Sequence, residues 1–181
     1  MPNNVTTAKP KVGGAVFVAP LGTALPTDAT TALNEAFVSM GAISDEGYTI
    51  TPTMTSGTIK EWGGTDVYTY DDEYGIEFKM KFIEGLSINV LKLIYGDDNV
   101  TGSLSDGLKV KSNAKDRGEK SMVIEEILKN GTLSRTVIPC IKLKTLGEIP
   151  HKRNDAIAYD STFGANADAN GDTHITYYKS K

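Results

Sequence analysis

The side chains best suited to catalysis or metal binding are few and scattered. His151 and His174 are far apart in a chain of 181 residues, and neither has a second histidine at the spacing of a metal site. The single cysteine, Cys140, lies in the apolar segment 138–141, which favours a buried or half-buried small side chain over a nucleophile. The sequence therefore indicates surface histidines and a structural cysteine.

Two acidic loops have the composition of a cation site. Residues 168–172 read Asp-Ala-Asn-Gly-Asp, but they lack the glycine placement and the terminal glutamate of an EF-hand loop. Asp97 and Asp98 follow a predicted helix, where a solvated loop is expected. No P-loop and no Gly-Xaa-Ser-Xaa-Gly motif occurs. We expect no catalytic residue, no metal site and no cofactor.

The elements that would position these side chains are mostly strands. Residues 74–84 alternate apolar and polar side chains, which predicts a half-buried strand. Residues 119–129 and 132–144 predict two longer strands joined by Asn130-Gly131, a strong signal for a tight hairpin turn. Further short strands are predicted at residues 15–19, 107–112, 154–162 and 174–178.

Two helices are predicted. The better one covers residues 87–95, with Ser87 as its cap and Gly96 at its end. A shorter one covers residues 29–37, capped by Thr27 or Asp28. The residues expected to pack the better helix against the sheet are Val90, Leu91 and Ile94. Together the elements predict a mainly β protein, a β-sandwich or partly open barrel with one flanking α-helix.

A long hairpin and two terminal arms complete the predicted organisation. Residues 44–72 alternate in two stretches around a Trp-Gly-Gly turn, with too few aliphatic residues to form a core. Such a hairpin needs a neighbour, and Trp62 is either an anchor for that neighbour or a cap on its own domain. We predict an N-terminal arm at residues 1–13, the sandwich domain at 14–163 and a C-terminal arm at 164–181.

The composition excludes several classes of protein. One cysteine cannot support a disulfide framework, and no apolar stretch approaches the roughly 18–20 residues of a membrane span. The net charge of -4 argues against tight nucleic-acid binding. Residues 61–100 carry a charge of -6 and residues 101–181 a charge of +3. These are either complementary surfaces between copies or ordinary solvated faces of one domain.

Several segments, in their order and spacing, resemble the major tail (tail-tube) proteins of long-tailed bacteriophages and related prophages. The resemblance covers roughly residues 12–180. The segments that carry it are residues 14–29 (GAVFVAPLGTALPTDA), continuing through Leu33, Phe37, Gly41 and residues 44–47 (SDEG), then 60–64 (KEWGG), 95–100 (YGDDNV) with Gly102, and 149–159.

The resemblance implies a structural protein of the virion tail. In that family a β-sandwich flanked by a helix is the subunit, six subunits form a ring, and the inner sheets join into a β-barrel around a channel for DNA. Rings stack through a long hairpin and terminal arms. The implied partners are the chain itself, the tape measure protein, and the tail-tip and tail terminator proteins. DNA would pass without specific binding, no membrane is involved, and assembly would take place in the bacterial cytoplasm. A flexible, non-contractile siphovirus tail is favoured.

The residues give this reading specific candidates. The inter-ring contact residues would be Thr55, Ile59, Trp62, Gly63 and Gly64. Glu77, Glu125 and Glu126 are candidates for the channel wall, with an ordinary outer surface as the alternative. The competing functions are a β-sandwich binding module, such as an adhesin or receptor-binding domain, and a small β-rich enzyme, which would require a convergent catalytic set that the sequence does not offer.

Overall fold

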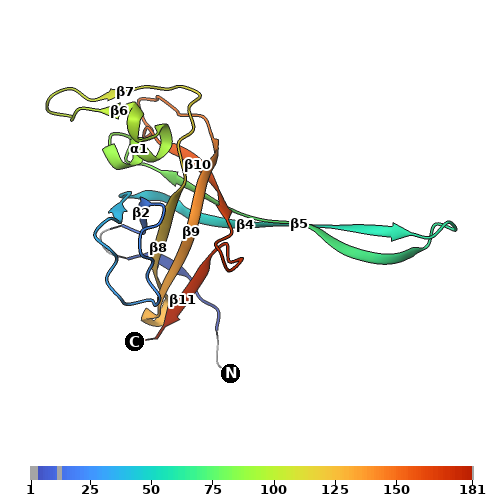
Figure 1. Cartoon of the computed structure of the whole chain (residues 1–181). Helices are drawn as coiled ribbons and strands as arrows, with labels where there is room; N and C mark the ends of the chain where they lie inside the picture. Colours follow the sequence, from blue (N-terminus) through green and yellow to red (C-terminus); the bar gives the residue numbers. More distant parts are fainter. Residues whose placement is uncertain (1–3, 12–13, 181) are drawn as a thin grey trace.

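The structure, a computed structural model, describes residues 4–11 and 14–180 and is mainly β with one α-helix (Figure 1). Residues 1–3, 12–13 and 181 of the two predicted arms lie outside the described residues. The helix is α1 (Ile88–Tyr95), and the strands are β1 (Ala8–Pro10), β2 (Val16–Pro20), β3 (Val38–Ser39), β4 (Ile43–Lys60), β5 (Asp66–Phe82), β6 (Val100–Thr101), β7 (Lys109–Val110), β8 (Lys120–Leu128), β9 (Leu133–Leu146), β10 (Tyr159–Asn166) and β11 (Ile175–Lys179).

The main sheet is built on the β8–β9 hairpin. Its order is β3-β2-β8-β9-β10-β5-β4, with β1 on the edge of β8 and β11 on the edge of β9, and it is not closed into a barrel. The turn of this hairpin has φ values of 73° at Asn130 and 78° at Gly131, as a type I′ turn requires. The prediction of a mainly β fold with one flanking helix is confirmed.

Two apolar clusters lie on opposite faces of the central strands. The larger cluster is formed by side chains of β2, β5, β8, β9 and β10 and by one face of α1. Val90, Leu91 and Ile94 are buried in it, together with Phe78 and Phe82 of the sheet. The residues of this cluster alternate with polar residues along β5, so the strand has a dry inner face and a wet outer face.

The smaller cluster lies beneath the segment between β2 and β3. Phe37 of this segment packs with Ala19, Val123 and Val137. The predicted helix at residues 29–37 is wrong, because the segment contains only turns and bends. Asp28 does act as a cap: hydrogen bonds from Thr31 and Thr30 hold the pKa of its carboxyl well below the usual range. The capped chain turns but does not continue as a helix.

The two terminal segments are attached to the sheet to different degrees. The described part of the N-terminal arm is exposed along its length except at Lys11, and β1 pairs with β8. The predicted C-terminal arm is not separate, because residues 164–166 complete β10 and β11 pairs with β9 from Ile175↔Val137 to Lys179↔Leu133. That part of the domain prediction is wrong.

A buried ion pair joins three separate parts of the fold. Arg135 of β9 is 2% exposed, and its guanidinium binds the carboxylate of Glu125 on the neighbouring strand β8. Glu125 also accepts a hydrogen bond of 2.9 Å from Lys11 of the arm, and Arg135 donates one of 2.7 Å to the carbonyl of Asp28. Arg135 and Glu125 therefore hold the arm and the 21–37 segment to the central hairpin.

Glu125→Gln should destabilise the monomer by about 3 kcal/mol, because it leaves the buried Arg135 charge without its counterion. Chemical denaturation at a concentration where the chain is monomeric measures this. The matched control is Glu77→Gln, which removes a carboxylate from an exposed pair with Lys144 and should change stability by less than about 1 kcal/mol. Equal effects of the two substitutions would contradict the role given to Arg135 and Glu125.

Candidate functional site

The most prominent feature of the molecule is the β4–β5 hairpin, which projects far beyond the sheet (Figure 1). Only its inner part is covered, where β5 also pairs with β10 as far out as Ile76. Beyond the cross-strand pair Thr53↔Gly75 the hairpin is a two-stranded ribbon with no other strand beside it. It is one continuous element, whereas the sequence predicted a hairpin at 44–72 and a separate strand after it.

The outer part of this hairpin, residues 54–74, is here called the distal ribbon. It exposes an unusual number of large apolar side chains. Trp62 lies at the tip and is fully exposed, so the alternative that it caps its own domain is excluded for this chain alone. The other exposed members are Met54, Ile59, Val67, Tyr68, Tyr70 and Tyr74.

The tip is a tight, internally bonded turn. The amide of Glu61 donates to the carbonyl of Thr65 and the amide of Gly64 donates to that of Glu61, both at 2.9 Å. Gly64 has a φ of 89°, which glycine adopts at little cost. Gly63 and Gly64 therefore shape the turn, and the side chain that they present is that of Trp62.

The shaft of the distal ribbon is ordered by its tyrosines and by a β-bulge. Tyr70 lies across Gly57, where any larger residue would collide with the ring, and its ring stacks on that of Tyr68 at a centroid distance of 6.4 Å. At the bulge, the Thr55 hydroxyl accepts a hydrogen bond of 3.1 Å from the amide of Glu73. Thr55 thus supports the ribbon internally, while Ile59 and Trp62 are free to contact a partner. The tyrosines were missed in the sequence, although tyrosines repeated among acidic residues without aliphatic partners signal such a surface.

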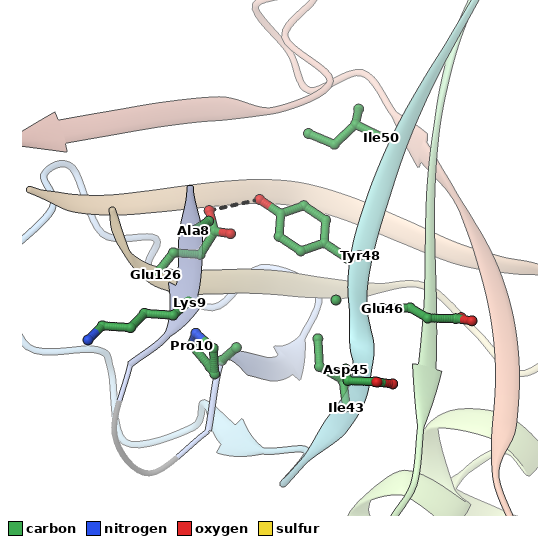
Figure 2. A pocket seen from close by; sticks show the side chains of 11 residues that line it. Ala8, Lys9, Pro10, Ile43, Asp45, Glu46, Tyr48, Ile50 and Glu126 are labelled. Atoms are coloured by element: carbon green, nitrogen blue, oxygen red, sulfur yellow. Dashed lines mark hydrogen bonds between the residues drawn. The ribbon is translucent and has the colours of Figure 1, made fainter. Parts of the chain in front are cut away.

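A pocket of about 400 Å³ lies at the base of the hairpin, between β1, β4 and β8 (Figure 2). Residues 44–47 bulge out of the ladder between Ile43 and Tyr48 and form one wall. The Tyr48 hydroxyl donates a hydrogen bond of 3.1 Å to Glu126 across the pocket, while the carboxylates of Asp45 and Glu46 point away from this contact. This contact links the base of the hairpin to β8, and β1 of the arm lines the same pocket.

Glu125 and Glu126 occupy opposite environments although they are adjacent. Burial alone raises the pKa of Glu125, but the hydrogen bonds from Lys11 and Arg135 outweigh it, so the pKa is lowered. At Glu126 burial dominates and the pKa is raised, in spite of the hydrogen bond from Tyr48. The pKa of Tyr48 is itself raised by burial and by the neighbouring Glu126.

The three carboxylates proposed for a channel wall are not brought together. Glu125 is 6% exposed in its ion pair, so the expectation that it lies on a wet face is wrong: a carboxylate between two cations in a sheet has no water to face. Glu126 is half-buried in the pocket. Glu77 lies on the outer face of β5, 2.6 Å from Lys144 of β9.

This outer face of β5, β10 and β9 is here called the polar sheet face. Several of its charges are paired: Lys79 lies 3.2 Å from Asp160 of the neighbouring strand, and Lys142 lies 3.0 Å from Asp116 of the loop before β8. Cys140 lies beside Asn166, and burial raises the pKa of its thiol, which opposes reactivity. The face is therefore a polar, nearly charge-balanced surface.

The remaining candidates for chemistry stay separate. His174 packs edge-on against Phe78 at 5.5 Å, and burial lowers its pKa. Residues 168–172 form a turn in which Asp168 accepts bonds from the amides of Asn170 and Asp172. In the described part of the chain, no group of three or more His, Cys, Asp or Glu side chains is placed to hold a metal ion. The same residues include no helix of sufficient length and apolarity to cross a membrane.

Comparison with models of protein families identifies the family of this chain. A family model described as phage tail tube protein matches residues 2–181, almost the whole chain. No curated protein matches the chain. The family is a structural one, and its match covers the sheet, the helix and the projecting hairpin alike.

The two adjacent glutamates should titrate on opposite sides of the ordinary value of 4.5, Glu125 below it and Glu126 above it. Glu125 then stabilises the fold above its unfolded pKa, and this stabilisation is lost as the pH falls through its folded pKa. Glu126 acts in the reverse sense: its contribution is present at low pH and is lost as the pH rises through its folded pKa. Carboxyl ¹³C NMR of the monomer measures both.

Tyr48→Phe provides the test within the same spectrum. Removing the hydroxyl takes away a hydrogen bond that lowers the pKa of Glu126, so this pKa should rise further, while the pKa of Glu125 stays unchanged. A shift of both glutamates, or of neither, would contradict the separation of the two environments.

Proposed function

Because the chain belongs to the phage tail tube protein family and is therefore a structural subunit of the virion tail, we propose that it assembles as stacked hexameric rings around a channel for genome delivery. The observation that carries the proposal is the distal ribbon, which exposes Trp62, Tyr68 and Ile59 far from the sheet. A ribbon of this length and composition gains little from folding on its own and gains most from burial against another subunit.

The ribbon fits an inter-ring contact in detail. Ile59 and Trp62 form the contact itself, Gly63 and Gly64 set the turn that presents Trp62, and Thr55 stabilises the shaft. Exposed aromatic side chains on a pre-ordered support are typical of the residues that dominate binding energy at interfaces. The N-terminal arm, held at the sheet edge by Lys11, contributes to the same contacts between subunits.

We assign the channel wall to the polar sheet face. It carries Glu77, paired with Lys144, and other charges that largely neutralise one another. Such a surface offers DNA phosphates no uncompensated cation cluster, which suits passage without capture. Glu126 is less exposed and contributes to the wall only where the base of the hairpin borders the channel.

The proposal implies further partners within the tail. They are a tape measure protein inside the tube, a tail-tip complex from which it grows and a terminator that caps it. The tube belongs to a flexible tail of the siphovirus type and assembles in the cytoplasm of the bacterial host. These partners set the length and ends of the tube, whereas its diameter follows from contacts between copies of this chain.

Electron microscopy of the purified protein tests the proposal. Hollow tubes of uniform width, or six-fold rings, are expected, alone or on addition of tail-tip proteins. A monomer or trimer that never polymerises under these conditions, and that binds a receptor or glycan instead, would overturn the proposal in favour of an adhesin-like module.

Trp62→Ala should raise the critical concentration for polymerisation by about tenfold or more, because it removes a fully exposed aromatic anchor. Its effect on the stability of the monomer should stay within about 0.5 kcal/mol. Sedimentation of tubes and thermal unfolding of the monomer measure the two. The matched control is Leu86→Ala, an exposed apolar residue outside the hairpin.

Removing the distal ribbon should abolish tube growth and leave the sheet folded. Thr53 and Gly75 are cross-strand partners, so residues 54–74 can be replaced by Asn-Gly without disturbing the ladder below them. Circular dichroism checks the fold and electron microscopy checks assembly. Tubes formed by the shortened chain would contradict the stacking role of the hairpin.

A further inference from the structure

Unpaired acidic side chains gather on the distal ribbon. Glu61, Asp71, Asp72 and Glu73 are exposed, and in the described part of the chain none has a cationic group within 4 Å. The ribbon has no lysine or arginine from residue 61 to residue 74. These carboxylates flank the apolar side chains described above, so the ribbon has both an apolar and an acidic surface for a partner.

Unpaired basic side chains gather on the segment between β6 and β8, residues 102–119, here called the basic excursion. Lys109, Lys111 and Lys115 are exposed and, among residues 4–11 and 14–180, have no carboxylate within 4 Å. The segment holds four basic residues against three acidic ones. Of the acids, Asp116 pairs with Lys142, whereas Asp106 keeps its charge and accepts from the Ser103 and Ser105 hydroxyls. The excursion therefore presents a net positive surface.

The basic excursion is held in place before any partner arrives. The amide of Lys111 donates to the carbonyl of Asn99 at 2.8 Å, and the side chains of Asn99 and Asn113 exchange hydrogen bonds. Asn99 is buried and also donates to the carbonyl of Tyr95 at the end of α1. The lysines are thus presented by a loop fixed to the core, which reduces the entropy lost on binding.

The β4–β5 hairpin and the β6–β7 loop, at which the basic excursion begins, project in opposite directions (Figure 1). In Figure 1 the hairpin projects from one side of the sheet, while the β6–β7 end of the basic excursion projects from the other. One copy cannot bring its own two surfaces together, but successive copies in a head-to-tail array can. Two complementary surfaces at opposite ends of one molecule favour head-to-tail stacking of many copies over a symmetric dimer.

We propose that the acidic distal ribbon of one copy docks on Lys109, Lys111 and Lys115 of a copy in the next ring. The assignment rests on the proposed function and names the receiving surface for the hairpin. Charge complementarity sets the direction and register of stacking, while Trp62 and Tyr68 supply the apolar burial. Because these charges are exposed, stacking weakens as salt rises.

Charge reversal tests the contact: reversing one surface should weaken it, and reversing both surfaces together should restore it. Lys109→Glu, Lys111→Glu and Lys115→Glu in one chain, or Asp71→Lys, Asp72→Lys and Glu73→Lys in another, should each raise the critical concentration for tubes about tenfold or more. A chain that carries all six substitutions should recover tubes at close to the original concentration, since the charges are again complementary. The control for the lysine reversal is Lys129→Glu, Lys152→Glu and Arg153→Glu, which changes the net charge by the same amount at exposed residues outside the basic excursion.

The outcomes separate this inference from the function on which it rests. Suppose that the unaltered chain forms tubes. If either reversal then leaves the critical concentration unchanged, or if the chain with all six substitutions does not recover tubes, the docking surface is wrong and the tail tube function stands. If the unaltered chain forms no tubes, the function itself fails. Binding of labelled duplex DNA by the monomer is measured in parallel. Loss of DNA binding with unchanged assembly on reversal of the lysines would assign them to DNA and overturn the docking contact.

Discussion

A two-stranded β-ribbon has no interior, and this constraint governs the architecture of the molecule. Along its inner half, β5 escapes the constraint because β10 pairs with it and Phe78 and Phe82 are buried in the core. Along its outer half no other described strand pairs with it, and Trp62 and the tyrosines remain in solvent. The same strand therefore runs from the core of the protein to a surface that only a partner can bury.

Polar contacts brace the central hairpin on both faces. Arg135 and Glu125 tie the arm and the 21–37 segment to the central hairpin, and Tyr48 ties the bulge at residues 44–47 to Glu126. A buried ion pair adds little stability over an apolar pair, but its loss leaves a charge in a dry site. The contribution of Arg135 and Glu125 is positional: the pair fixes the arm and the 21–37 segment on the sheet.

The sequence correctly predicted the elements whose conformation depends on residues close together in the chain. It failed where contacts between residues far apart in the chain determine the conformation. The conformation of the Asn130-Gly131 turn and the alternation at residues 74–84 follow from the local sequence, so the turn and the strand were predicted correctly. Asp28 has the side chain of a helix cap, but the packing of Phe37 on Val123 and Val137 fixes that segment as turns. The arginine opposite Glu125 could be recognised only with the β8–β9 register in hand. The strand at residues 174–178 was predicted, but its place in the sheet was not: β11 pairs with the part of β9 that extends beyond β10, so these residues belong to the sheet and not to a separate arm.

The register also changes the meaning of the acidic net charge. On the polar sheet face Glu77 and Asp160 each lie beside a lysine of another strand, and Asp116 of the adjoining loop lies beside Lys142. Exposed acids without an ion pair among the described residues gather on the distal ribbon, and exposed lysines without one gather on the basic excursion. A charge of -4 spread evenly would repel copies of the chain from one another. Gathered in this way, the same charges favour one relative orientation of two copies, and if the polar sheet face lines the channel as proposed, DNA passes a surface on which most charges are paired.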